Sequence, residues 1–174
     1  MSNKKRTTKK NPSTLKKILR IALAIVIPLG GGLLVSLLTI NAMSQFNTLK
    51  QPPLAPPAWL FPVAWTILYI LMGVASYLIY RAWEKGKKAE KHCARIALML
   101  YGVQLVFNFI WTPIFFNLGL YWVAFAVLMI MWVLEVILLA GIFRLSRGAF
   151  WCLLPYLLWT TFAAYLNVAI AILN

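Results

Sequence analysis

Acidic side chains are nearly absent from this chain. Its 174 residues include no aspartate and only the glutamates Glu84, Glu90 and Glu135, against 17 Lys and Arg. The one histidine, His92, stands beside Lys91 in a charged segment, so we interpret it as a solvated loop residue and not as a haem ligand. With no paired carboxylates and no Cys/His set at metal-ligand spacing, the sequence disfavours a conventional acid–base or metal enzyme and predicts no metal site.

Cysteine is equally scarce. Cys93 and Cys152 both fall where we expect cytoplasmic helix ends, in a reducing compartment. We therefore predict two free thiols and no disulfide. No glycine-rich loop between a strand and a helix offers a phosphate site either.

Apolar residues, in contrast, dominate the chain. Hydrophobic side chains make up 63% of it and the mean hydropathy is +0.82, which is typical of an integral membrane protein. The fold class predicted is an all-α integral membrane protein, a bundle of five transmembrane helices that forms one domain from residue 18 to residue 174. The predicted spans are about 18–40, 58–82, 94–112, 121–143 and 149–172.

Glycine and proline punctuate these spans. Pro28 and the triplet from Gly30 to Gly32 fall in the middle of the first span, where they favour a kink or a close helix approach. Pro113 is expected to end the third span. The Pro-Pro pairs of QPPLAPP exclude helix from residues 51–57, which we predict to be a loop.

Positive charge predicts the topology. All of the Lys and Arg except Lys50 lie in the first residues, in the linker from Arg81 to Arg95 or in the turn of Arg144 and Arg147. The positive-inside rule then places the N-terminus in the cytoplasm and the C-terminus outside, in a multi-pass protein of the cell membrane. Residues 1–17 are expected to be a disordered basic tail that contacts the anionic headgroups of the lipid bilayer. No basic face is interleaved with aromatics outside the spans, so we expect no nucleic-acid partner.

Three of the predicted helices carry aromatic and amide side chains in their outer halves. The set comprises Trp65 and Tyr69 on the second helix, Gln104, Asn108 and Trp111 on the third, and Trp159, Ala163 and Asn167 on the fifth. Spacings of three and four residues place each group on one helix face. Two interpretations are open on spacing alone: a ligand pocket, or a packed polar core of interhelical hydrogen bonds.

Glu135 is the one acidic residue inside a predicted span. A charge there costs a few kcal/mol and is a functional candidate by default. Protonation, pairing with Arg144 and packing against a neighbouring helix are all open interpretations. We assign it no mechanism.

Several blocks of this sequence resemble the TspO/MBR family, the tryptophan-rich sensory proteins whose mitochondrial member is the translocator protein, or peripheral benzodiazepine receptor. The blocks are LKQPPLAPPAWLFPVAWTILYILMG, QLVFNFIWTPIFF and LLPYLLWTTFAAYLN, with Trp132 where bacterial members often have tryptophan. The resemblance covers about residues 18–174, everything but the basic tail. Leu54 stands where the family has a tryptophan, and Phe143 replaces the tyrosine of the cholesterol-recognition pattern.

The resemblance implies a five-helix bundle, often a homodimer, with a pocket covered by the loop between the first two helices. Its implied ligands are porphyrins such as protoporphyrin IX or haem, bound non-covalently, together with isoquinoline carboxamide and benzodiazepine drugs. Pro56, Pro57 and Trp59 belong to the lid loop on this basis. A bacterial protein is favoured because the Lys-rich start is unlike an amphipathic transit peptide.

Three functions are compatible with this resemblance. The leading hypothesis is a receptor that binds tetrapyrroles and regulates tetrapyrrole or stress responses. The second is a transporter of porphyrins or other amphipaths, although the helices show neither an inverted repeat nor an ion-coupling carboxylate pair. The third is light-dependent breakdown of bound porphyrin, with Trp65 and Trp159 as the redox-active rings.

Overall fold

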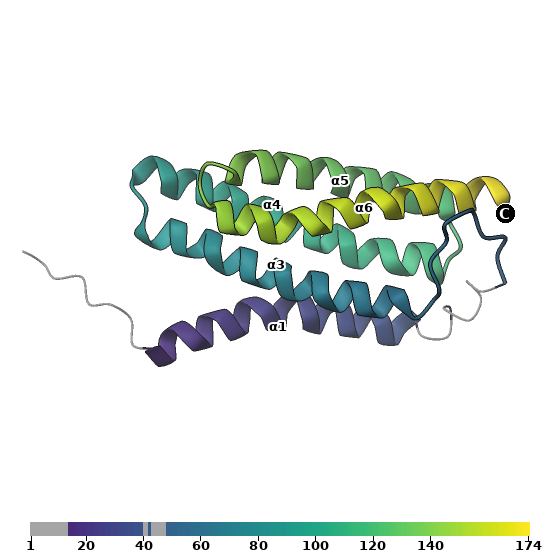
Figure 1. Ribbon diagram of the computed structural model, residues 1–174, viewed down its shortest axis with the longest axis horizontal. Helices are drawn as coiled ribbons and strands as arrows, with labels where there is room; N and C mark the ends of the chain where they lie inside the picture. Colours follow the sequence, from purple (N-terminus) through teal and green to yellow (C-terminus); the bar gives the residue numbers. More distant parts are fainter. Residues whose placement is uncertain (1–13, 40–41, 43–47) are drawn as a thin grey trace, which may run out of the picture.

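The computed structural model describes residues 14–39, 42 and 48–174, which form five helices and no strand. The helices are α1 (Thr14–Thr39), α3 (Leu60–Lys85), α4 (Lys88–Phe116), α5 (Tyr121–Ile142) and α6 (Arg147–Leu173). Each is long and apolar enough to cross a membrane. In Figure 1 the five helices lie beside one another, with their axes roughly along the long axis of the molecule. The prediction of an all-α membrane protein with five spans is confirmed.

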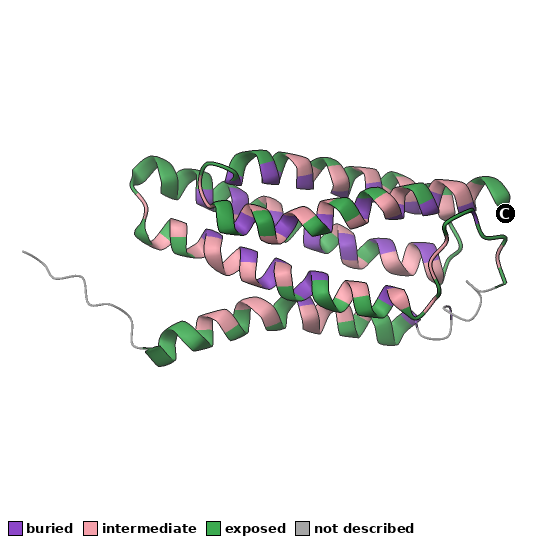
Figure 2. Cartoon of the chain, viewed as in Figure 1, coloured by how far each residue is buried: buried purple, intermediate pink, exposed green. Residues whose placement is uncertain are grey.

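Helices α3 to α6 enclose the core, and α1 packs onto them from one side. Each of the four contacts two others of the group, in the order α3, α4, α5, α6 and back to α3, whereas α1 contacts α3 and α4. Fully buried side chains such as Met72, Met131 and Leu153 fill the centre. In α1 only Pro28 and Thr39 are buried, and Figure 2 shows most of that helix as exposed or intermediate. The first helix therefore has the smallest buried share of the five described helices.

The backbones of α1 and α3 touch at one glycine. A methyl group placed on Gly73 would lie 2.6 Å from the Cα of Ile25, so this residue permits the helices to approach closely. Farther along, Gly32 of α1 leaves room for the ring of Tyr69. Figure 1 shows the axis of α1, which contains Pro28, changing direction about halfway along. The first half of α1 therefore contacts the backbone of α3 at Gly73. The second half contacts the side chain of Tyr69.

The expected stop at Pro113 was wrong, since α4 continues to Phe116 with Pro113 inside it. A proline removes one backbone donor, but ending the helix within a bilayer would leave several groups without partners. The turn after the proline closes in the usual way, because the backbone N–H of Asn117 donates to the carbonyl of Pro113 at 2.9 Å. Continuing the helix is therefore the less costly solution.

The predicted basic linker, residues 81–95, is helical at both ends. Only Gly86 and Lys87 separate α3 from α4. The backbone N–H of Lys87 donates to Oε2 of Glu90 at 2.7 Å, which caps the start of α4. Likewise, Thr14–Lys17 of the predicted tail belong to α1, while the rest of the tail, residues 1–13, lies outside the described residues.

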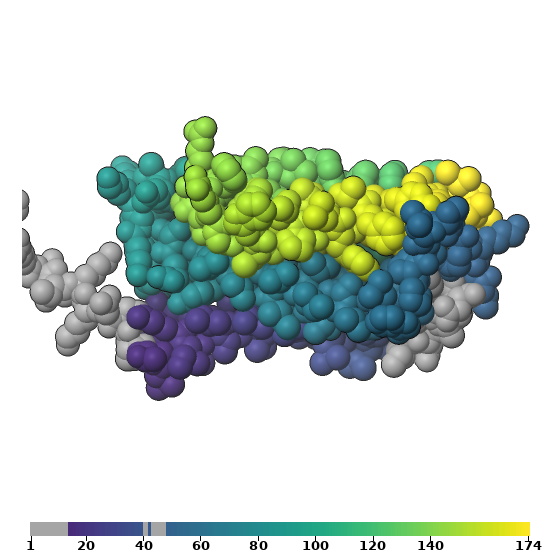
Figure 3. All heavy atoms as spheres, viewed as in Figure 1, coloured from purple at the N-terminus to yellow at the C-terminus, as the bar shows by residue number. Residues whose placement is uncertain are grey.

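The described part of the loop before α3 is tied to the end of α6. The hydroxyl of Tyr165 donates to the carbonyl of Pro53 at 2.7 Å. The side chain of Asn174 accepts from the backbone N–H of Lys50 at 2.9 Å and donates to its carbonyl at 3.2 Å. Figure 3 shows this segment (blue) against the end of α6 (yellow). Leu54 at the turn has φ +67°, the left-handed region that leucine rarely adopts.

Candidate functional site

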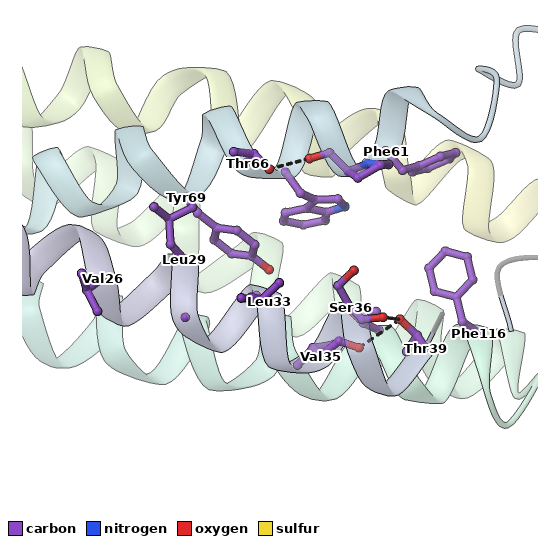
Figure 4. A pocket seen from close by; sticks show the side chains of 15 residues that line it. Val26, Leu29, Leu33, Val35, Ser36, Thr39, Phe61, Thr66, Tyr69 and Phe116 are labelled. Carbon is purple, nitrogen blue, oxygen red and sulfur yellow. Dashed lines mark hydrogen bonds between the residues drawn. The ribbon is translucent and has the colours of Figure 1, made fainter. Parts of the chain in front are cut away.

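A cavity of about 460 Å³ lies between α1, α3 and α4. We call it the α1–α3 cavity. The side chains that line it include Leu29, Leu33, Ser36, Thr39, Phe61, Trp65, Thr66, Tyr69, Thr112 and Phe116. Figure 4 shows Phe61, Thr66 and Tyr69 on one wall and Leu33, Ser36 and Thr39 on the facing helix. Its volume is within the range of small-molecule pockets.

Two stacked aromatic rings form part of the α3 wall. The rings of Trp65 and Tyr69 lie 5.5 Å apart with an interplanar angle of 28°. The hydroxyl of Tyr69 donates to Oδ1 of Asn108 at 2.7 Å, and Nδ2 of Asn108 donates to the hydroxyl of Tyr156 at 2.9 Å. Asn108 does not line the cavity. Its buried amide lies behind the cavity wall and fixes the orientation of the Tyr69 ring, which faces the cavity.

The rim of the cavity faces away from the bundle. Val26 and Leu33 of α1 are 59% and 62% exposed, and Pro62 and Thr66 of α3 are exposed as well. In a membrane-spanning protein, apolar side chains exposed along a helix face the lipid. The cavity thus opens between α1 and α3 toward the bilayer.

Hydroxyl groups supply the polar part of the lining. Thr66 donates to the carbonyl of Pro62 at 2.7 Å, Thr39 to that of Val35 at 3.0 Å, and Thr112 to that of Asn108. Since these protons are used within the helices, the oxygens remain available as acceptors. None of the described residues that line the cavity carries a charge. The lining therefore suits a flat, largely apolar ligand.

Trp111, Ala163 and Asn167 meet in a second, nearly filled region. Nε1 of Trp111 donates to Oδ1 of Asn167 at 3.1 Å, and Nδ2 of Asn167 donates to the carbonyl of Tyr121 at 2.8 Å. The void beside them has only about 10 Å³. Trp111 and Asn167 therefore form interhelical hydrogen bonds, as expected for a packed polar core, and Ala163 packs beside them.

Together with Phe116, Phe61 lies between the two regions. Its ring lines the α1–α3 cavity and also the small void beside Trp111 and Ala163. On the α6 side it meets Trp159 edge to face, with ring centroids 6.1 Å apart. The sequence analysis missed this residue, although its position four residues before Trp65 places both on one helix face.

Gln104 and Glu135 are fully buried away from the cavity. Neither polar atom of the Gln104 amide has a hydrogen-bond partner among the described residues. Oε2 of Glu135 accepts from the hydroxyl of Thr160 at 3.0 Å, so the glutamate faces α6. Arg144 is exposed, and no ion pair between it and Glu135 is present in the described chain.

The predicted lid residues lie beside the cavity and not in its lining. Trp59 is 65% exposed, Pro57 is exposed and Pro56 is half-buried. They lead directly into Phe61 and Pro62, which do line the cavity. Residues 40–41 and 43–47 of the same loop lie outside the described residues. That these residues form a lid stays a prediction, as does ligand binding by the eight predicted site residues.

Five apolar helices, three of which line an aromatic cavity, define a multi-pass membrane protein. A model of the TspO/MBR family matches residues 24–173, and the chain belongs to that family. The recognition made from the sequence blocks is thereby confirmed.

The relatives include bacterial and animal proteins. The chain is 34% identical over 161 residues to "Tryptophan-rich protein TspO" of Chlorobaculum tepidum, covering 91% of this chain and 98% of that one. It is 36% identical to "Tryptophan-rich sensory protein" of Cereibacter sphaeroides, covering 74% and 76%. It is also 35% identical to "Translocator protein" of Ovis aries, covering 70% of each chain.

Proposed function

We propose that this protein is a membrane receptor that binds flat porphyrins, such as protoporphyrin IX or haem, in the α1–α3 cavity. The observation that carries the proposal is the stacked pair Trp65 and Tyr69 on the wall of a 460 Å³ cavity. A flat conjugated ring gains both apolar burial and ring stacking against such a wall. The name of one relative, tryptophan-rich sensory protein, supports a sensory role, which we propose to concern tetrapyrrole or stress responses.

The geometry suggests how a ligand would be held. The macrocycle would lie between Leu29 and Leu33 of α1 and the rings of α3, with any propionates directed past the exposed Ser36 toward water. Entry would come from the bilayer, where amphipathic porphyrins partition, through the rim between α1 and α3. Because α1 is the least buried helix, it is the wall that can adjust to the ligand.

Membrane placement and assembly belong to the same proposal. We place the protein in a bacterial cytoplasmic membrane, with the N-terminus in the cytoplasm, on the distribution of Lys and Arg. The basic tail would contact anionic headgroups. We also propose a homodimer, because the family resemblance implies one.

A titration of the purified protein with protoporphyrin IX in the dark tests this proposal. The readout is the shift of the porphyrin absorption band, which does not depend on how many tryptophans a variant retains. Trp65→Ala is expected to weaken binding at least tenfold, because the ring is part of the cavity wall. Trp151→Ala, which alters a 64% exposed tryptophan on α6, is the matched control and should leave binding unchanged. Equal binding by the two variants would refute the proposed site.

Light-dependent breakdown of the bound porphyrin is a second candidate, favoured by the position of Trp65 in the cavity wall. Trp159 does not line the cavity and would act only through Phe61. Illumination should then convert the porphyrin to a new absorbing product only when both the protein and dissolved oxygen, the oxidant of the reaction, are present. Trp65→Phe should abolish the conversion and Trp159→Phe should slow it.

A further inference from the structure

A second hollow lies at the opposite end of the bundle from the loop of residues 48–59, where α3 turns into α4 (Figure 1). It measures about 350 Å³ and is lined by Tyr80 and Trp83 of α3 and by Arg95, Leu98 and Met99 of α4. We call it the basic groove. It shares no residue with the α1–α3 cavity.

The groove changes in polarity along its length. Arg95 is exposed, and Leu98 and Met99 follow it by three and four residues on the same face of α4. At a rise of ~1.5 Å per residue they lie about 5 Å deeper in the membrane. Trp83 is 37% exposed, and its ring lies 5.7 Å from that of Tyr80 across the α3 side. The pairing of Tyr69 with Asn108 places Arg95 at about the depth of Trp83 and Tyr80 on the neighbouring helix, so a cation lies beside two aromatic rings and next to a deeper apolar wall.

The carboxylates near the groove are already engaged. Oε1 of Glu84 holds Arg20 at 2.8 Å, and that guanidinium also lies over the ring of Tyr80, 5.4 Å from its centroid. Glu90 accepts the backbone N–H of Lys87. The cations around the α3–α4 turn are Arg81, Lys85, Lys87, Lys88, Lys91 and Arg95, and none of them forms an ion pair within the described chain. Among the described residues, the α3–α4 turn therefore carries six cations against one carboxylate, Glu90, that is not paired with a cation.

We propose that the basic groove binds one anionic phospholipid. The phosphate would accept hydrogen bonds from the Arg95 guanidinium, whose planar fork suits phosphate oxygens. Trp83 and Tyr80, at about the depth of Arg95, would flank the headgroup and the glycerol, in the interfacial zone where amphipathic rings are favoured. An acyl chain would cover Leu98 and Met99. The proposal concerns a partner and a site separate from the ligand cavity and does not rest on porphyrin binding.

Native mass spectrometry of the full chain, released from micelles that contain equal amounts of phosphatidylglycerol and phosphatidylcholine, tests the proposal. The wild type should retain phosphatidylglycerol preferentially, with one molecule held most tightly. Arg95→Gln should weaken that binding about fivefold, the change expected from ~1 kcal/mol per interfacial cation. Arg144→Gln removes an exposed arginine from the same end of the bundle without touching the groove, so it should keep the preference.

A second readout locates the lipid. Phosphatidylglycerol with brominated chains should quench a component of the tryptophan fluorescence that disappears in Trp83→Phe, whereas brominated phosphatidylcholine should not. Inorganic phosphate should fail to displace the lipid, because the apolar half of the groove contributes to binding. Equal loss in Arg95→Gln and Arg144→Gln, quenching that persists in Trp83→Phe, or displacement by phosphate alone would each overturn the proposal. Unchanged circular dichroism of both arginine variants establishes that they fold.

Discussion

The hydroxyl of Tyr69 donates a 2.7 Å hydrogen bond to Oδ1 of Asn108, joining the wall of the α1–α3 cavity to a fully buried amide. The same amide donates to Tyr156 on α6. One asparagine thereby connects α3, α4 and α6 at the depth of the candidate site. The ring of Tyr69 thus lines the candidate cavity and also takes part in a hydrogen-bond chain that links three helices.

Tyr69→Phe should lower stability while preserving most of the ligand affinity. The change leaves Oδ1 of Asn108 without its donor, and interhelical hydrogen bonds in membranes are worth about 0.6 kcal/mol on average and up to about 1.7. The ring itself, which stacks on Trp65, remains. Unfolding in sodium dodecyl sulfate followed by circular dichroism measures the loss. Porphyrin affinity that falls as far as in Trp65→Ala would instead make the hydroxyl a direct ligand contact.

Gln104→Met should leave stability unchanged or raise it by up to about 1 kcal/mol. The amide is fully buried and has no hydrogen-bond partner among the described residues, so its replacement removes an unmet desolvation cost. Asn108→Leu is the contrasting variant, because it leaves the Tyr69 hydroxyl without its acceptor and removes the donor to the Tyr156 hydroxyl. The same unfolding assay compares them. A Gln104→Met loss as large as that of Asn108→Leu would show that Gln104 makes an essential contact.

Gly73→Ala should destabilise the bundle by about 1–3 kcal/mol, the usual cost of overpacking. The added methyl would meet the backbone of Ile25 at 2.6 Å, and a backbone cannot rotate away as a side chain can. Gly141→Ala on α5 is the control, since its methyl meets nothing within 4 Å. The control should be neutral or slightly stabilising because alanine favours helix. Equal unfolding midpoints for the two variants would contradict the close α1–α3 contact.

Phe61→Ala should join the α1–α3 cavity to the region beside Trp111 and Trp159. The ring lies between them together with Phe116, so its removal gives a bound porphyrin access to Trp159. Trp159→Ala should then weaken porphyrin binding in the Phe61→Ala background, in a dark absorption titration, but not in the wild type. Equal effects of Trp159→Ala in the two backgrounds would mean that Phe61 does not separate the ligand from Trp159.

The helices could be predicted from the sequence because apolar runs of membrane length have few alternatives. Their ends were less accessible. Pro113 is a helix breaker in water, but within a bilayer the helix continues through it to Phe116. The start of α4 was signalled by Glu90, three residues after Lys87, and that capping pattern was overlooked.

The spacing of residues in the sequence predicted only part of the candidate site. Helical periodicity indicated that Trp65 and Tyr69 share a face, and in the structure they stack. Periodicity shows which residues share a helix face, but it does not show which neighbouring helix that face contacts. Asn108, Trp111 and Asn167 therefore came into the predicted pocket, whereas the structure satisfies them with one another and with neighbouring hydroxyl and carbonyl groups. The α1 side of the cavity was missed because Leu29, Leu33 and Ser36 look like ordinary lipid-facing residues.

Gly30→Leu is the most direct test of whether the α1–α3 cavity binds the ligand. Gly30 lines the cavity, and a methyl placed on it meets nothing within 4 Å, so leucine would fill the space without an initial clash. Gly102→Leu on α4 is the matched control, equally open but outside the cavity, and both changes favour helix. In a dark protoporphyrin IX titration, Gly30→Leu should bind at least about tenfold more weakly, a loss of ~1.4 kcal/mol, while Gly102→Leu binds as the wild type does. Wild-type affinity in a well-folded Gly30→Leu protein would place the ligand elsewhere and contradict the account.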